Sequence, residues 1–346
     1  MPASAISPAS EIQISVVVPV YRAEQTLPQL CERLTRALSG LSPDFEIILV
    51  DDRSPDNSWQ VILGLLPRYP RIMAVRLSRN FGQHYAITAG LDLSRGRWAV
   101  VMDCDLQDQP EDIGLLLAKA QEGYDIVLAR RVAREDPFAK RLSSAVFYKV
   151  FGLLSGYTLD RSVGSFRIME RRVVDAFCRM RETYRLFGGM IEWLGFSTAY
   201  TDTRHVARAD GRSAYDRRAL MRLALDGIIS FSNRPLYVSV LVGAGMAIVS
   251  TACGVALILY FVIGGFAGVP GWLSLMALTT FIGSLILFNL GVIGIYLGRL
   301  YDQTKQRPLY VVDRVVVGAD VAGCSLGLPP WGEPSSRRPG APASIR

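Results

Sequence analysis

This sequence has few histidines, no paired cysteines and no early glycine-rich phosphate loop, and each of these lacks argues against a class of protein. The 346 residues contain only two histidines, His84 and His205, which is too few for a metal centre built on imidazole. The five cysteines form no Cys-x-x-Cys pair, so we expect reduced thiols without a metal, in a cytosolic setting. No Gly-x-Gly-x-x-Gly segment follows an early strand, which argues against a dinucleotide-dependent dehydrogenase.

Charge is missing from one long stretch of the chain. Between Pro235 and Gly298 the sequence contains no aspartate, glutamate, lysine or arginine. The two apolar runs within this stretch, Leu236–Ile263 and Trp272–Gly298, each exceed the roughly 20 residues that a helix needs to span a bilayer. We therefore predict two transmembrane helices. The alternative is a helical hairpin buried in the core of a soluble protein.

The basic residues on either side of these runs predict their orientation. The turn between the runs, residues 264–271, carries no charge. The basic residues before the first run are Arg217, Arg218, Arg222 and Arg234, and those after the second are Arg299, Lys305 and Arg307. By the positive-inside rule both flanks lie in the cytoplasm. We expect a multi-pass protein of the cytoplasmic (inner) membrane, without a cleaved signal peptide, whose soluble part and both termini are cytoplasmic.

The positive charge of the chain is also unevenly placed. The net charge is +7, and much of the basic content lies between Arg130 and Arg234, just before the apolar stretch. This placement favours a membrane surface or phosphorylated ligands over nucleic acid, for which the sequence shows no motif. We interpret the apolar stretch Leu220–Phe231 as an amphipathic helix at the membrane interface, the alternative being a core helix of the soluble domain.

Strand-like and helix-like segments alternate in the first part of the chain. The predicted strands are Ile14–Val20, Phe45–Val50, Met73–Leu77, Trp98–Met102 and Asp125–Ala129. The predicted helices are 27–41, Trp59–Leu66, Gln83–Leu93 and Pro110–Glu122. Because the strands are fully apolar and alternate with helices, we predict an α/β fold with a mostly parallel sheet that is covered on both faces.

These patterns divide the chain into six parts. They are a flexible N-terminus (1–12), an α/β domain (13–219), a juxtamembrane helix (220–234), two transmembrane helices (236–263 and 272–298) and a cytoplasmic tail (299–346) whose end we expect to be disordered.

Two acidic clusters directly follow predicted strands. Asp51 and Asp52 follow the second strand, and Asp103 and Asp105 follow the fourth. Because ligands of parallel sheets bind beyond the carboxyl ends of the strands, we expect both clusters to face one crevice. Two carboxylates and the amide oxygen of Gln107 are oxygen ligands that suit Mg²⁺ or Mn²⁺. An Asp-x-Asp pair by itself also occurs by chance in loops, so the surrounding motifs decide its meaning.

Five motifs in order carry a family resemblance. They are Ser15–Tyr21, Glu24, Val50–Ser58, Asn80–His84 and Asp103–Gln107. Together they resemble the GT-A glycosyltransferases of family 2, over residues Ile14 to about Arg131. The resemblance implies a Rossmann-like GT-A domain with a nucleotide-sugar donor and a Mg²⁺ or Mn²⁺ cofactor.

Later segments are similar to one branch of that family. They are Val163–Ile168, Arg208–Ser213 with Tyr215, Asp226–Ser232, Pro235–Leu236 and Tyr296–Tyr301. They resemble the enzymes that use a polyprenyl phosphate acceptor, among them dolichol-phosphate mannose synthases, bactoprenol glucosyltransferases and undecaprenyl-phosphate aminoarabinose transferases. The last two groups carry two membrane helices after the catalytic domain.

The resemblance implies a role for individual residues. The donor-binding residues are Pro19, Tyr21, Glu24, Asp51, Asp52, Ser54, Asp103 and Arg131. The metal ligands are Asp103, Asp105 and Gln107. The acceptor phosphate binds Arg208, Arg212 and Ser213, and the catalytic residues are Asp103, Asp105 and Arg208. For His84 we weigh contact with the donor against a structural hydrogen bond.

The chain departs from the family pattern at two positions. Ser162 stands where relatives often have aspartate, with Asp160 two residues earlier, and Ala214 stands where relatives have lysine. We expect Arg212 to supply the missing charge.

These observations predict metal-dependent, inverting transfer of a sugar to a polyprenyl phosphate of the undecaprenyl type, on the cytoplasmic leaflet, for modification of cell-envelope glycans. The alternatives are a processive polysaccharide synthase of the same family, whose Gln-x-x-Arg-Trp motif we do not find, and a catalytically silent membrane scaffold that retains the fold. The expected partners are the donor, the lipid and the membrane, and not nucleic acid. Assembly into a homo-oligomer is left open.

Overall fold

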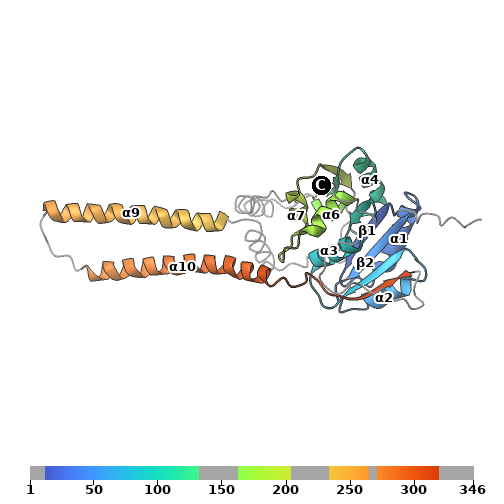
Figure 1. Ribbon diagram of the computed structural model, residues 1–346, viewed down its shortest axis with the longest axis horizontal. Coiled ribbons are helices and arrows are strands. Elements are labelled where there is room, and N and C mark those ends of the chain that lie inside the picture. The colour runs from blue at the N-terminus through green and yellow to red at the C-terminus, as the bar shows by residue number, and fades with distance from the viewer. Residues whose placement is uncertain (1–11, 132–162, 204–233, 265–270, 319–346) are drawn as a thin grey trace, which may run out of the picture. The chain divides into compact units, whose positions relative to one another are not determined.

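The computed structural model describes residues 12–131, 163–203, 234–264 and 271–318. The chain divides into two compact units, each of which is described by itself. The first unit contains the sheet and its helices, and includes the described residues 307–318 near the C-terminus. The second unit contains two long helices (Figure 1).

The first unit is built on one eight-stranded sheet in the order β7-β5-β6-β4-β1-β2-β3-β8. The strands are β1 (Ile14–Val20), β2 (Phe45–Asp51), β3 (Ile72–Leu77), β4 (Trp98–Val101), β5 (Ile126–Arg131), β6 (Val163–Glu170), β7 (Thr198–Thr203) and β8 (Val312–Val317). The strands β1–β5 and β7 run in one direction, and only β6 and β8 run against them. The prediction of a mostly parallel α/β sheet is therefore confirmed.

Helices cover both faces of this sheet. They are α1 (Leu27–Ser39), α2 (Ser58–Leu65), α3 (Gln83–Leu93), α4 (Ile113–Gln121) after the short 3₁₀ helix η1 (Pro110–Asp112), α6 (Arg171–Arg179) and α7 (Phe187–Trp193). One hydrophobic core joins α1, α2 and α4 to alternate residues of the strands. The helix α3 packs on β1 and β2, and α6 packs on α3 and β6, over the other face.

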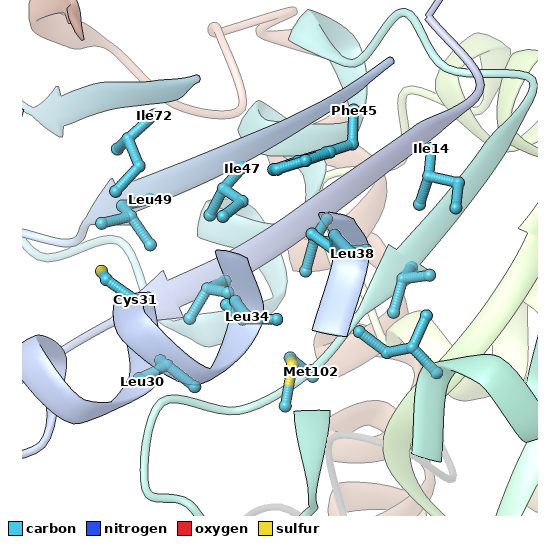
Figure 2. Close-up of a cluster of buried hydrophobic side chains, with 14 of the residues drawn as sticks. Ile14, Leu30, Cys31, Leu34, Leu38, Phe45, Ile47, Leu49, Ile72 and Met102 are labelled. Atoms are coloured by element: carbon cyan, nitrogen blue, oxygen red, sulfur yellow. The ribbon is translucent and has the colours of Figure 1, made fainter. Parts of the chain in front are cut away.

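The core under α1 shows why this segment forms a helix. Its leucines at positions 27, 30, 34 and 38 recur at helical spacing, and all four are fully buried. Figure 2 shows Leu30, Leu34 and Leu38 in one cluster with strand residues such as Ile47 and Leu49. Each fully buried leucine stabilises the fold by about 1.5–3 kcal/mol.

A close approach fixes α3 against the opposite face. A Cβ atom on Gly90 would lie 2.3 Å from Val17 Cγ1 and 3.2 Å from Val50 Cγ2. Glycine therefore lets the helix backbone lie directly on β1 and β2. This packing holds the first turn of α3, which begins at Gln83, against the carboxyl ends of the same strands.

The C-terminal part of the chain returns to the sheet, which the sequence analysis did not predict for its cytoplasmic tail. β8 pairs antiparallel with β3, and the amide of Ser78 donates to the Val311 carbonyl at 2.8 Å. Arg53 forms an ion pair with Asp313 at 3.0 Å. A chain truncated before the long helices would therefore also lose an edge strand of the first unit.

The described part of the second unit contains α9 (Arg234–Gly264) and α10 (Trp272–Thr304), which contact each other. Among the described residues, Leu278–Thr304, which is 27 residues long, is the segment that is long and apolar enough to cross a membrane, with a mean hydropathy of 2.0 over an 18-residue window. The apolar stretch Leu236–Ala252 in α9 is shorter. One membrane-crossing helix is thus supported, and the second stays a prediction.

The early elements closely follow the sequence prediction. β1 and α3 have the predicted bounds, and the other predicted strands and helices differ by a few residues at their ends. The predicted helix Pro110–Glu122 begins instead as a 3₁₀ turn before α4. The predicted interfacial helix 220–234 lies almost wholly outside the described residues.

Candidate active site

Parallel strands end together at one edge of the sheet, which we call the carboxyl edge: the ends of β1, β2, β3 and β4 with their following loops. β1 lies between β2 and β4, with Val20 opposite Asp51 and Val17 opposite Val101. The Asp51–Asp52 pair and the Asp103–Asp105 turn therefore both leave the sheet at this edge, as the sequence analysis expected.

Hydrogen bonds join the loops after β1 and β2. The amide of Arg22 donates to Ser54 Oγ at 3.3 Å, and the amide of Asn57 donates to Glu24 Oε2 at 3.0 Å. Pro19 is buried inside β1, whereas Tyr21, directly after the strand, exposes 43% of its surface. The joined loops thus present one exposed aromatic ring above a buried strand end.

Backbone strain gathers at the same edge. Arg22, Arg53 and Leu106 have φ angles of 54°, 54° and 58°, a left-handed conformation that side chains with a Cβ rarely adopt. Each lies in the loop after a strand of the carboxyl edge, namely β1, β2 and β4. Strained residues persist only where the surrounding structure fixes them, and they cluster at functional sites.

The carboxylates after β2 face the protein interior. Asp51 is fully buried, accepts the Ser54 amide at 3.0 Å and lies 3.4 Å from Arg76 Nε. Asp52 accepts the amides of Phe81 and Gly82, each at 2.7 Å. Burial raises the pKa of Asp52, although these two amide donors oppose the shift. Asp51 Oδ1 and both carboxylate oxygens of Asp52 therefore accept hydrogen bonds that shape the loops, whereas Asp51 Oδ2 only faces Arg76. Contact with a ligand stays a prediction for both residues.

The acidic turn after β4 has a different environment. Asp103, Asp105 and Gln107 are each half-buried. The amide of Gln107 donates to Asp105 Oδ1 at 3.1 Å, which closes a tight turn around the strained Leu106. Thr26 at the start of α1 donates to the Cys104 carbonyl at 2.8 Å and so ties the turn to the loop after β1.

The oxygen atoms of this turn fit a divalent cation of the Mg²⁺ or Mn²⁺ type. Within the described ranges, no three histidine, cysteine or acidic side chains gather as a ready-made metal cage. Mg²⁺ is usually bound by one or two carboxylates, with water and ligand phosphates completing its octahedron. Asp103, Asp105 and the Gln107 amide would provide such a partial set, open on the ligand side.

Two further side chains approach Asp103 from neighbouring elements. Gln83 Nε2, at the start of α3, donates to Asp103 Oδ1 at 2.7 Å. Arg167, on β6 beside β4, is buried and donates to the carbonyls of Gly164 and Ser165. Burial lowers the pKa of Arg167 to about 10, and the charge of Asp103 opposes this shift. The positive charge of Arg167 and the negative charge of Asp103 therefore attract each other.

Two titratable groups near the acidic turn are uncharged at neutral pH. Burial raises the pKa of the Cys104 thiol to about 12, so this thiol is protonated at neutral pH. Burial, together with the charges of Arg185 and Arg167, lowers the pKa of His84 to about 4. His84 is therefore a neutral ring, and its Nδ1 atom is buried without a hydrogen-bond partner in the described part of the chain. The choice between donor contact and a structural hydrogen bond stays a prediction.

A cavity of about 380 Å³ lies at the opposite edge of the sheet, at the amino ends of β1 and β4. Its lining includes Gln13, Trp98, Asp125 and Arg172. Asp125 and Arg172 form an ion pair there. The cavity is thus separated from the acidic turn by the length of the strands, and we do not assign it to the site.

Comparison with known proteins agrees with this geometry. Residues 15–177 match the glycosyl transferase family 2. An uncharacterised glycosyltransferase of Synechocystis is 38% identical over 302 residues, which cover 87% of this chain and 95% of the relative. The bactoprenol glucosyl transferase of Shigella phage SfX is 35% identical, with coverage of 87% and 99%. A prophage bactoprenol glucosyl transferase homologue of Escherichia coli K12 is also 35% identical, with coverage of 88% and 99%.

The chain belongs to glycosyltransferase family 2. The match with the bactoprenol glucosyl transferases over nearly their whole length places it in the branch that the sequence resemblance indicated. The protein is a glycosyltransferase, and its mostly parallel sheet is the Rossmann-like GT-A domain of that family.

Solved structures give more distant matches. Glucosyl-3-phosphoglycerate synthase of Mycobacterium tuberculosis, solved with Mn²⁺, UDP and its product, is 18% identical with a TM-score of 0.46, covering 64% of this chain and 80% of that chain. Mannosyl-3-phosphoglycerate synthase of Rubrobacter xylanophilus is 18% identical with a TM-score of 0.46, covering 64% and 74%. At this level the similarity carries no functional information.

Several predicted site residues cannot be placed with the others. Arg131 ends β5, whose pairing with β6 brings this strand end to the carboxyl edge, but its side chain is not described. The predicted acceptor residues Arg208, Arg212 and Ser213 lie outside the described residues, as do Ser162 and Asp160. Their roles remain predictions for this glycosyltransferase.

The structure adds two neighbours of Asp103 that the sequence analysis left without a role. Gln83 lies in the Asn80–His84 motif and Arg167 in the Val163–Ile168 motif, both of which carried the family resemblance. The motifs were therefore a usable signal. What the sequence could not give is that both motifs meet at Asp103, because that depends on α3 and β6 flanking β4.

Proposed function

We propose that this glycosyltransferase transfers a sugar from a nucleotide-sugar donor to a polyprenyl phosphate, in a metal-dependent reaction that inverts the anomeric centre. The half-buried pair Asp103 and Asp105 at the carboxyl edge is the observation on which the proposal depends. The long matches with bactoprenol glucosyl transferases support a polyprenyl phosphate as the acceptor.

Asp103, Asp105 and Gln107 would hold Mg²⁺ or Mn²⁺ against the donor pyrophosphate. A bound divalent cation supplies Lewis-acid stabilisation of the charge that develops on the leaving phosphates. The chain itself orients the ligands. The backbone N–H of Gln107 donates to the Asp105 carboxylate and fixes it, and the strained Leu106 sets the shape of the turn. We assign the exposed ring of Tyr21 and the joined loops after β1 and β2 to the nucleotide.

The acceptor needs little help from a general base. A phosphate monoester has a second pKa of about 6, so it is mostly a dianion at neutral pH and already nucleophilic. Cationic side chains then act by holding the phosphate in line with the anomeric carbon. On the family resemblance we assign this task to Arg208 and Arg212, with Ser213 as a further contact of the acceptor phosphate, and contact with donor phosphate to Arg131. In-line attack on an α-linked donor gives inversion.

The acceptor also determines where the enzyme works. Its prenyl tail stays in the bilayer, so its phosphate lies at headgroup level and the site must face a membrane surface. The apolar segment Leu278–Thr304 supports membrane attachment. We propose that α9 and α10 both cross the cytoplasmic membrane and that the first unit faces the cytoplasm, where the basic flanks of the helices also lie.

The test is a reaction with defined components. Full-length protein in detergent is incubated with undecaprenyl phosphate, Mn²⁺ or Mg²⁺ and a panel of nucleotide sugars, and the lipid fraction is analysed by mass spectrometry. We expect one donor to give a lipid heavier by a single sugar, and chelation of the metal to abolish the product. Transfer to a soluble acceptor instead, or transfer that persists after chelation, would contradict the proposal.

A further inference from the structure

The turn formed by residues Asn80–His84 connects the two acidic clusters of the carboxyl edge. Its amides at Phe81 and Gly82 donate to the two oxygens of Asp52, each at 2.7 Å. Gly82 has a φ angle of 105°, which glycine adopts without strain. The next residue, Gln83, begins α3 and contacts the other cluster. One short turn therefore spans from the loop after β2 to the loop after β4.

Gln83 holds Asp103 by a side-chain hydrogen bond. Its Nε2 donates to Asp103 Oδ1 at 2.7 Å and lies 3.5 Å from Ser165 Oγ on β6. The side chain of Gln83 is exposed, so it lies at the solvent side of the site rather than in the core. Because Gln83 is exposed, its hydrogen bond to Asp103 contributes little to the packing of the core.

The backbone of Gln83 is also fixed from two directions. The neighbouring Gly82 is bound through its amide to Asp52, and α3 is packed against β1 by the close contact between Gly90 and Val17. The donor atom therefore has a defined starting point in space. A hydrogen bond from such a group fixes the rotation of the carboxylate about its side-chain bond.

We propose that Gln83 is a positioning residue that orients the Asp103 carboxylate for the divalent cation. The inference rests on the proposed function, because Asp103 is a metal ligand only within it. Partners of metal ligands set the ligand's orientation, and their loss typically weakens metal binding by about 10- to 100-fold. Through the Asn80–His84 turn, the same contact ties the position of the metal to that of the loop after β2.

The test compares two variants of Gln83 with a matched control. Gln83→Met keeps the length of the side chain and removes the donor, and Gln83→Asn keeps the amide but shortens its reach by one methylene. Gln60→Met makes the same change at an exposed position in the first turn of α2, outside the Asp103–Gln107 and Asn80–His84 turns. Mn²⁺ binding to the full-length protein in detergent, without donor or acceptor, is measured by electron paramagnetic resonance.

We expect both Gln83 variants to bind Mn²⁺ about 10- to 100-fold more weakly than the wild type, with an unchanged unfolding temperature, and Gln60→Met to bind normally. Sugar transfer by Gln83→Met should recover at high Mn²⁺ concentration, which loss of a merely structural contact would not produce. If one variant fails to fold, the other decides.

Two results would overturn the inference, and they can be told apart. If both folded Gln83 variants bind Mn²⁺ as tightly as the wild type, Gln83 does not orient the ligand, while the proposed function stands. If the wild type is folded and binds no Mn²⁺, the metal-dependent function fails together with the role of Gln83.

Discussion

Carboxylates lie at both ends of the sheet, but their surroundings differ. At the amino ends of β1 and β2, Glu46 is buried and accepts Ser15 Oγ at 2.6 Å, the Arg95 amide at 2.7 Å and Arg95 Nη2 at 2.7 Å. At the carboxyl edge, Asp103 and Asp105 are only half-buried and stand in a turn with a strained residue, Leu106.

This difference separates a structural carboxylate from a chemical one. Glu46 is enclosed by donors from its own fold, so its charge is satisfied without a ligand. Asp103 and Asp105 keep part of their surface toward solvent, where a cation with its phosphate ligands has access. An acidic residue at the end of a strand is thus not informative by itself, whereas its enclosure and the backbone strain around it are informative.

Substitution at the acidic turn should give the largest effect on activity. Asp105→Asn keeps the shape of the side chain but removes the charge that attracts the cation. We expect the rate of sugar transfer to fall by about 100- to 1,000-fold, comparable to the loss of one group that stabilises transition-state charge. The rate is followed by mass spectrometry of the lipid product. An unfolding temperature that falls along with the rate would mean that Asp105 is structural.

The matching change at the amino end should show the opposite profile. In Glu46→Gln the new amide group would face the donors of Arg95, which satisfy the carboxylate in the wild type. We expect a loss of about 2 to 3 kcal/mol in the free energy of unfolding, with sugar transfer per folded molecule unchanged. Chemical denaturation and the lipid assay measure the two quantities. A loss of transfer without a loss of stability would break the comparison.

The neutral ring of His84 should make stability depend on pH. Its pKa is about 4 in the folded protein against an ordinary value of 6.5, so the unfolded chain binds the extra proton in this interval. The contribution of the neutral His84 ring to the free energy of unfolding is complete above pH 6.5 and is lost as the pH falls toward 4. At about pH 5 the loss is about 2 kcal/mol.

The check is the difference in unfolding temperature between about pH 7.5 and about pH 5, for the wild type and for His84→Gln. We expect a smaller difference in the variant, which lacks the titrating ring. Equal differences in the two proteins would show that His84 does not titrate in this interval and that other groups determine the acid sensitivity.

The smallest effect is expected where the segment around Tyr310 packs against the rest of the first unit. Tyr310 Oη donates to Asp92 Oδ2 at 2.7 Å, and Arg181 also pairs with Asp92 at 2.8 Å. Tyr310→Phe removes one hydrogen bond and leaves the ion pair in place. We expect a loss of about 1 kcal/mol in the free energy of unfolding, measured by chemical denaturation. No measurable change would mean that this segment is not fastened through Tyr310.

The sequence predicted the first half of the sheet well because its signals are local. Apolar strands such as β1 and the leucine spacing of α1 identify their elements without knowledge of their neighbours. The rule that parallel strands bind ligands at their carboxyl ends then placed Asp103 near Asp51.

The later strands were missed because their signals are weak or non-local. β7 is polar along most of its length, and β8 lies beyond two apolar helices, so its partner β3 is far away in sequence. The same limit applies to the site. Gln83 and Arg167 belong to recognised motifs, but their convergence on Asp103 follows from α3 packing and from β6 pairing with β4.

The central claim is tested most directly by calorimetry. The nucleotide sugar that serves as donor in the lipid assay is titrated into full-length protein with and without Mn²⁺. If Asp103 and Asp105 hold a cation against the donor pyrophosphate, donor binding should require Mn²⁺ in the wild type and in Glu46→Gln, and should be lost in Asp105→Asn. Donor binding of equal strength in Asp105→Asn, or in the absence of any divalent cation, would contradict the account.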